Sequence, residues 1–226
     1  ALKRGGVGSV LNVAGVDEVR ALQKVAVEET RLGIPLLFGL DVIHGYQTLT
    51  PIPLAEAASW DMEAVQNSAR AAAREATADG INWTFAPMVD ISRDPRWGRN
   101  QEAPGEDPHL TSKYIAGYVR GLQEGEDPRY LQAVVTLKHW DAYSLENVSA
   151  LGITRHNFDA LISNFSLAST YLPAFRETVV EGKAAGVMCS YNSVNGVPTC
   201  ASTALNATLR GAWGFDGYVT SDTGAV

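Results

Sequence analysis

The sequence predicts an α/β protein whose parallel sheet is built from about six β-α units, as either a doubly wound sheet or a (β/α)8 barrel. Apolar, β-rich runs alternate with amphipathic helical stretches along the whole chain. The strand-like runs show little alternation of apolar and polar residues, as expected for strands buried on both faces. A β-α alternation of this kind favours a parallel sheet with right-handed crossovers.

Each element rests on its own pattern. In the first helix Val19, Leu22 and Val25 recur near helical spacing, and Gly33 is its expected stop. The second helix is rich in alanine, with Ser59 as its expected N-cap and Gly80 at its C-cap position. In chain order the expected strands are 7–13, 34–40, 81–89, 132–137, 184–191 and 218–221, and the expected helices are 17–32, 61–79, 110–123, 167–181 and 203–211.

Composition excludes several classes of function. The 226 residues carry a formal charge of −7 and no run of Lys or Arg, which argues against nucleic acid and anionic membranes as partners. No apolar run approaches the ~20 residues of a membrane span. No signal peptide is visible, so we expect any targeting segment to be removed or to lie upstream. We see no internal repeat or linker, and expect one domain over residues 1–226.

Motifs for bound cofactors are absent from the sequence. No Gly-x-Gly-x-x-Gly follows the first strand, and there is neither a Walker A sequence nor a Gly-x-Ser-x-Gly elbow. The four histidines lack ligand spacing and the two cysteines do not form a Cys-x-x-Cys pair, so we expect no metal and no cofactor.

The two cysteines, Cys189 and Cys200, flank a loop. They are either a disulfide or a buried thiol with an incidental one, and we expect the disulfide if the protein is secreted. The sequons at Asn147, Asn164 and Asn206 are compatible with secretion, whereas Asn82 begins an apolar strand and is expected to stay unmodified. We therefore expect a secreted or periplasmic location.

Polar side chains cluster after the expected strands. In a barrel these strand ends share one rim, where the active site lies. The residues are Asp41 and His44; Asp90, Arg93, Asp94, Arg96 and Arg99; Lys138 and His139; Tyr191 and Asn192; and Asp222.

These residues resemble a site for a polyol. Several charged groups would bind hydroxyls, Arg99 could bind vicinal acceptors with its fork, and Trp97 and Trp140 would cover an apolar ring face. Asp222 is either a nucleophile or the cap of a following helix, and one arginine is expected in a structural ion pair, Arg96 with Glu102 or Glu106. A carboxylate nucleophile in a polyol site suggests glycoside cleavage, which needs a second carboxyl group, roughly 5–5.5 Å away in retaining enzymes.

Four motifs, in order, carry a family resemblance: Gly39-Leu-Asp-Val-Ile-His-Gly45, Arg93-Asp-Pro-Arg-Trp-Gly-Arg99, Lys138-His139 and Ser221-Asp222. Over essentially the whole chain the sequence resembles the N-terminal TIM-type (β/α)8 barrel domain of glycoside hydrolase family 3. The resemblance implies that Asp222 is the retaining nucleophile. It implies that the sugar-binding residues are Asp41, Arg99, Lys138, His139 and Tyr191.

The resemblance also sets expectations about what this chain lacks. Family barrels continue beyond the nucleophile strand, and most members add an α/β sandwich domain that carries the acid/base Glu. We therefore expect a partial barrel, truncated after the nucleophile strand, with the sandwich domain in the full-length protein. The histidine-bearing loop of the N-acetylglucosaminide-cleaving branch is absent after Lys138-His139.

The resemblance points to two different substrates, a β-D-glucoside and a β-D-xyloside. Asp41 lies in a β-glucosidase-like motif, and xylosidases typically carry the longer Glu there, so we expect an exo-acting β-D-glucosidase. The segments 98–107, 138–147 and 188–200 resemble β-D-xylosidases, which is the alternative. The expected partner is a small oligosaccharide or aryl glycoside. From other classes, a non-catalytic carbohydrate-binding barrel fragment and a barrel using Lys138 as a Schiff base stay open.

Overall fold

The computed structural model describes residues 1–226, and its main feature is a curved parallel sheet with six strand positions in chain order. β4 and β5 form one position, because Thr136 alone separates them: β4 pairs with β3, and β5 pairs with β7. A bridge between Met88 and Lys138 continues the pairing across that point. The strands are β1 (Ser9–Leu11), β2 (Leu37–Leu40), β3 (Trp83–Thr84), β4 (Val134–Val135), β5 (Leu137–Trp140), β7 (Gly186–Cys189) and β10 (Tyr218–Ser221).

Helices connect these strands, as the sequence predicts, with shifted ends. They are α1 (Val16–Glu28), α2 (Pro53–Ala57), α3 (Met62–Ala78), α4 (Pro108–Gln123), α5 (Asn164–Ser166), α6 (Leu172–Val180) and α7 (Thr203–Asn206). The π-helical segments Leu167–Tyr171 and Ala207–Ala212 join α5 to α6 and extend α7. Short 3-10 turns cover Leu2–Arg4, Asn100–Glu102, Ser149–Leu151 and Thr199–Ala201.

The start of α3 differs from the expectation. Asp61, not Ser59, is the N-cap, because its carboxylate accepts the N–H of Ala64 at 2.9 Å. The hydroxyl of Ser59 instead donates to the carbonyl of Glu56, which closes the preceding short helix α2.

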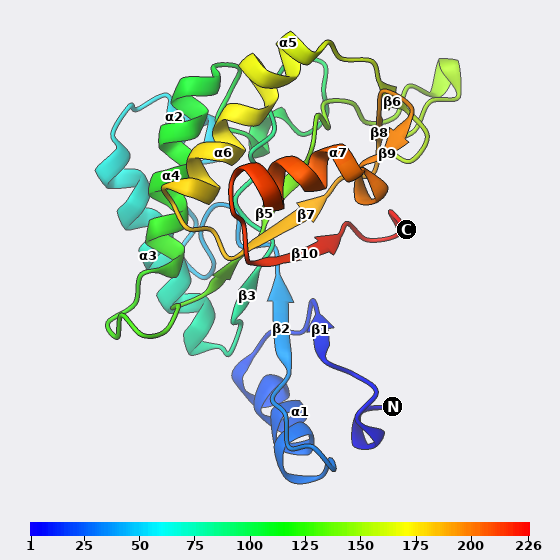
Figure 1. Cartoon of the computed structure of the whole chain (residues 1–226). Coiled ribbons are helices and arrows are strands. Elements are labelled where there is room, and N and C mark those ends of the chain that lie inside the picture. Colours follow the sequence, from blue (N-terminus) through cyan, green and yellow to red (C-terminus); the bar gives the residue numbers. More distant parts are fainter.

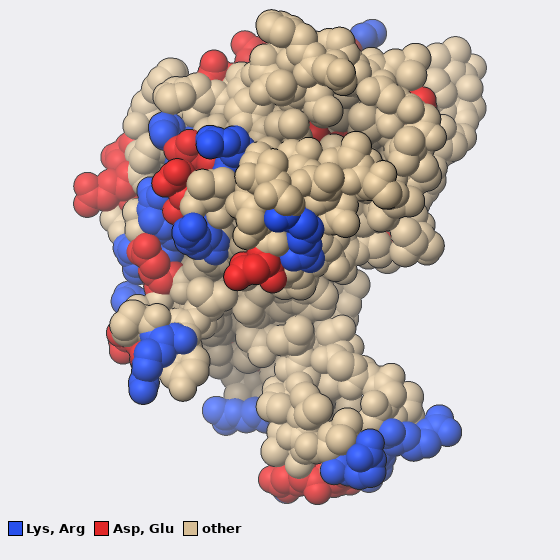
Figure 2. Space-filling model, viewed as in Figure 1, with Lys and Arg blue, Asp and Glu red and all other residues tan.

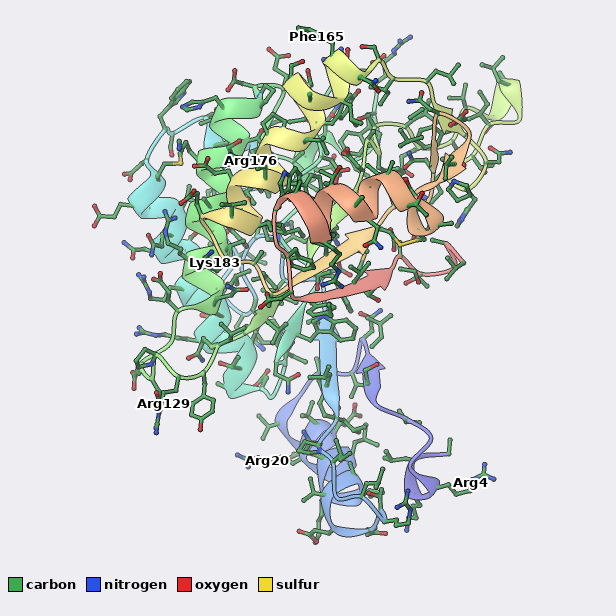
Figure 3. All side chains as sticks on the ribbon, in the orientation of Figure 1. Arg4, Arg20, Arg129, Phe165, Arg176 and Lys183 are labelled. Atoms are coloured by element: carbon green, nitrogen blue, oxygen red, sulfur yellow. A yellow bond between two sulfur atoms is a disulfide. The ribbon has the colours of Figure 1, made fainter.

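A small second sheet lies beside the strand ends and was not predicted from the sequence. β6 (Asp159–Ala160) pairs in parallel with β8 (Ser193–Val194), which forms an antiparallel hairpin with β9 (Val197–Pro198). Each strand has only two residues, too few for a periodicity to be read. The sheet is reached through the long segment after β5. Phe165 of the following helix α5 points outward at the top of the view in Figure 3.

The main core lies between the sheet and the layer formed by α3, α4 and α6, which Figure 1 shows covering one side of the strands. Val135, Leu137 and Val187 of the strands are fully buried there. Figure 2 shows charged side chains gathered over this helical layer, while the face above α7 is largely uncharged. A second cluster, built around Val19 and Phe38, packs β2 between α1 and α3. No helix is long and apolar enough to cross a membrane.

Candidate active site

A cavity of about 560 Å³ lies at the carboxyl ends of the strands. It contains all six residues that the sequence analysis selected, although they come from segments as distant as 41 and 222. Its lining consists of Ser9, Leu11, Asn12, Asp41, Trp83, Phe85, Arg99, Glu102, Lys138, His139, Arg155, Met188, Tyr191, Thr220, Ser221, Asp222 and Thr223. The rim clustering expected for a barrel therefore exists in three dimensions.

Asp222 directly follows β10 and is held by the neighbouring strand. Ser221 is in register with Cys189, and the N–H of Asp222 donates to the carbonyl of Cys189 at 3.2 Å. The N–H of Thr223 donates to Asp222 Oδ1 at 2.7 Å. The side chain is only 12% exposed, so the carboxylate is fixed in a largely dry part of the cavity.

The surroundings of Asp222 favour its ionised form. Burial alone would raise its pKa, but contact with His139 and the charge of that ring, together with Thr223 N–H and Tyr191, lower the pKa to about 2. His139 Nε2 lies 3.2 Å from Asp222 Oδ2, which is an ion-pair distance without the alignment of a hydrogen bond. Oδ2 thus lies buried beside the imidazole without an aligned donor.

His139 is oriented from behind by Asp90. Its backbone N–H donates to Asp90 Oδ2 at 3.0 Å, and its Nδ1 lies 2.9 Å from the same oxygen. Because a carboxylate only accepts, Nδ1 carries a proton, and Nε2 is left between Asp222 Oδ2 and Arg99 Nη1, which is 3.3 Å away.

Arg99 is the arginine held in a structural ion pair, with Glu102. Nε and Nη2 of Arg99 donate to the two oxygens of Glu102, both at 2.8 Å. Burial opposes the charge of both side chains. The fork and the charge of Glu102 nevertheless raise the pKa of Arg99, and the fork and the charge of Arg99 lower the pKa of Glu102. The expected pairing through Arg96 is wrong, because that side chain is 89% exposed and bonds Asp94.

Lys138 and His139 lie within β5, not after a strand ending at 137 as expected. Their side chains diverge: Lys138 forms an ion pair with Asp41, and His139 faces Asp222. Lys138 is 4% exposed, whereas Asp41 is 49% exposed. Asp41 therefore keeps oxygen free for a ligand while its charge is balanced.

The aromatic residues of the cavity are not those expected. Trp97 and Trp140 are 5% and 2% exposed, and neither lines it. Trp140 packs against Phe175 and Trp213 in the main core, on the opposite side from His139. The pairing of β5 with β7 is irregular between Leu137 and Trp140, so a simple alternation of faces does not place these side chains.

Trp83 and Phe85 supply the apolar wall instead. The indole N–H of Trp83 donates to the hydroxyl of Tyr218 at 2.6 Å, which fixes the ring. Phe85 lies over β2, where a Cβ on Gly39 would be 2.7 Å from it, so only glycine leaves room for that ring.

Sequence reasoning did not assign the roles of three residues: Asp90 behind His139, Glu102 beneath Arg99, and Arg155 in the cavity wall. Asp90 stood out only as a polar residue after the third strand, and Glu102 was expected to pair with Arg96. Arg155 follows a segment without a clear pattern, and no signal in the sequence marks it.

The family follows from comparison with known proteins. The model of the glycosyl hydrolase family 3 N-terminal domain matches residues 1–226. The chain belongs to glycosyl hydrolase family 3. The TIM-type barrel expected from the resemblance is confirmed: a β-glucosidase from Listeria innocua in complex with glucose is 39% identical over 96% of this chain and 30% of its own, with a TM-score of 0.86.

Relatives of both substrate classes exist among curated family 3 proteins. A β-xylosidase/α-L-arabinofuranosidase from Medicago sativa subsp. varia is 39% identical over 93% of the chain, and a periplasmic β-glucosidase from Salmonella typhimurium is 40% identical over 100% of it. The chain spans about 30% of the length of these two relatives.

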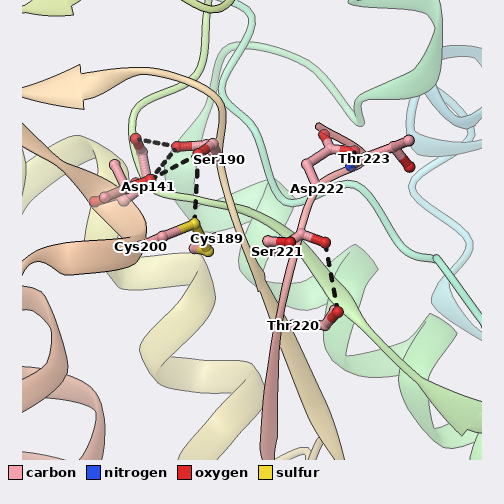
Figure 4. Close-up of a disulfide and its surroundings, with 9 residues drawn as sticks. Asp141, Cys189, Ser190, Cys200, Thr220, Ser221, Asp222 and Thr223 are labelled. Carbon is pink, nitrogen blue, oxygen red and sulfur yellow. Dashed lines mark hydrogen bonds between the residues drawn. A yellow bond between two sulfur atoms is a disulfide. The ribbon is translucent and has the colours of Figure 1, made fainter. Parts of the chain in front are cut away.

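The predicted disulfide between Cys189 and Cys200 is confirmed, with a Cα–Cα distance of 5.1 Å. It ties the 3-10 turn Thr199–Ala201 to the end of β7. Figure 4 shows this bond beside the strand that ends in Asp222. The disulfide therefore braces the segment that carries Tyr191.

Proposed function

We propose that this chain forms the sugar-binding barrel of a retaining, exo-acting β-glycosidase in which Asp222 is the nucleophile. The observation that carries the proposal is the Asp222 carboxylate, ionised and nearly buried, in the lining of a cavity that also holds several hydroxyl-binding groups.

The chemistry follows from the charge on Asp222. An oxygen of the Asp222 carboxylate attacks the anomeric carbon and forms an ester bond, while the bond from that carbon to the aglycone oxygen breaks and its electron pair leaves with the oxygen. A poor leaving group needs a proton at this moment. Asp41 and Glu102 are both ion-paired with cations, so neither is suited to donate one. Aglycones of low pKa leave without a proton.

Sugar recognition is assigned to the groups around Asp222. Asp41 accepts from hydroxyls, and Arg99, Lys138 and His139 donate to them, with Tyr191 beside the nucleophile. Trp83 and Phe85 offer an apolar surface to a ring face. The charged groups are already paired, so they are held in place before the ligand arrives.

Between the two substrate classes we propose a β-D-glucosidase. Asp41 is one methylene shorter than the Glu expected in xylosidases, which leaves space for the hydroxymethyl group of glucose. The second candidate, a β-D-xylosidase, is favoured by relatives such as the probable β-D-xylosidase 7 of Arabidopsis thaliana, 44% identical over 93% of the chain.

The expected setting of the protein is also part of the proposal. Its substrate is a small oligosaccharide or aryl glycoside, and the barrel acts together with an α/β sandwich domain in the full-length protein, which the greater length of the relatives supports. A secreted or periplasmic location is supported by the disulfide and by the periplasmic relative.

The test is covalent labelling with 2,4-dinitrophenyl 2-deoxy-2-fluoro-β-D-glucoside, followed by peptide mass spectrometry. The expected result is one label per chain, on Asp222, and none in Asp222→Asn. A label on Glu102 or Glu146 would overturn the assignment of roles. Glucose binding in both proteins, measured by calorimetry, without any label would favour the non-catalytic carbohydrate-binding alternative.

A further inference from the structure

Arg155 and Glu146 form an ion pair at the edge of the cavity, on the long segment between β5 and β6. Arg155 Nε donates to Glu146 Oε2 at 2.8 Å, and its Nη2 lies 2.5 Å from the same oxygen. The two side chains are 33% and 17% exposed, so water screens the pair only partly. Arg155 is thus held in one position.

The guanidinium of Arg155 lies on the ring of Tyr191, with its central carbon 5.0 Å from the ring centroid. The ring of Tyr191 also stacks near His139, at 6.5 Å and 28°. His156 meets the same ring edge-on at 4.6 Å. Tyr191 is therefore in contact with Arg155 and with the residue that contacts Asp222.

Glu146 also holds a second ring against His139. Its Oε1 accepts a short hydrogen bond from the hydroxyl of Tyr143, whose ring packs edge-on against His139 at 4.9 Å. One carboxylate thus fixes Tyr143 directly and Tyr191 through Arg155. Both rings border the imidazole that lies 3.2 Å from Asp222.

We propose that Arg155, anchored by Glu146, is a positioning residue that holds the ring of Tyr191 beside His139 and so helps to orient the imidazole next to Asp222. The inference rests on the proposed function and extends it to two residues with no assigned role. Arg155 acts in two ways: through the cation–π contact it fixes the ring, and through its charge it favours ionisation of the phenol.

The charges that face Tyr191 allow the role of Arg155 to be tested by titrating the Tyr191 phenol, without measuring catalysis. Burial and the charge of Asp222 raise the pKa of Tyr191, and Arg155 lowers it. His139, His156 and Tyr143 are the other titratable groups on the ring. Removing the cation should therefore move the phenol titration to higher pH, an effect that a purely packing role would not produce.

The experiment compares Arg155→Met, Arg155→Lys and Glu146→Gln with the unaltered chain. The matched control is Arg96→Met, since that arginine also pairs with a nearby carboxylate but is 89% exposed. Tyrosines carry 13C at Cζ, and Tyr191→Phe assigns the signal. The expected titration of Tyr191 moves upward in Arg155→Met, less in Arg155→Lys, and stays unchanged in Arg96→Met.

The same proteins are labelled with the dinitrophenyl 2-fluoroglucoside. The rate of labelling of Asp222 should fall roughly ten- to a hundredfold in Arg155→Met, the size expected when a reacting environment shifts by about 1 Å, with partial rescue by lysine. An unchanged Tyr191 titration, in a variant that melts like the parent, overturns the positioning role. If the Tyr191 titration moves in Arg155→Met but the parent takes no label on Asp222, the positioning role of Arg155 stands and the proposed nucleophile is overturned.

Discussion

Removing the disulfide should weaken both the fold and the site. The perturbation is the double replacement Cys189→Ser with Cys200→Ser. The bond closes a loop with a sequence separation of 11, for which the chain-entropy model gives a stabilisation of about 2.7 kcal/mol. For a chain of this size the melting temperature should then fall by about 5–11 °C.

The assay is urea unfolding followed by tryptophan fluorescence, with and without a reducing agent. The reduced parent should match the double variant, and the variant should not respond to reduction. Because the carbonyl of Cys189 accepts the N–H of Asp222 at 3.2 Å, labelling of Asp222 should also slow in the variant. A loss of stability below about 1 kcal/mol, or a reduced parent as stable as the oxidised one, would refute the reasoning.

Three further results are expected. Asp41→Glu should shift preference from aryl β-glucosides toward aryl β-xylosides, measured as the ratio of labelling rates with the matched 2-fluoroglycosides; an unchanged ratio would show that this position does not select. Gly121→Ala should destabilise the chain by about 1–3 kcal/mol in urea unfolding, because its Cβ would lie 2.4 Å from the carbonyl oxygen of Gln66 where α4 crosses α3; Gly211→Ala, with open space, is the control. The Asp222 carboxylate, with its pKa lowered to about 2, should stay reactive until the pH falls through that value. Its ionisation stabilises the fold above the unfolded pKa of about 3.9, and this stabilisation is lost as the pH falls to about 2. A labelling rate that is already halved near pH 4 would contradict the assignment.

Much of the site could be predicted from the sequence because its residues follow apolar runs. In a parallel barrel all such positions meet at one rim, so residues that follow strands in the sequence can be predicted to lie near one another. Asp41, Arg99 and Asp222 were found in this way, and they do share one cavity. The prediction needed only the approximate ends of strands.

The remaining features depend on facing directions and on long-range contacts, which a linear pattern does not contain. Trp97 and Trp140 do not cover the sugar site as expected, because residues close in sequence need not be close in space. Trp140 turns away from the cavity into the core. Arg155 was missed because its position depends on the small sheet β6-β8-β9, whose strands have two residues each. Likewise, Glu102 could be linked to an arginine, but not to the correct one.

The sheet has two open edges, and the cavity touches both. β1 pairs with β2 alone, and β10 pairs with β7 alone. Leu11 and Asn12 reach the cavity from one edge, and Thr220 and Asp222 reach it from the other. A sugar that fills this space would act as a cross-link between the first and last strands. A bound ligand should therefore stabilise both edge strands of the sheet. The expected sign is slower amide hydrogen exchange at the two edges together.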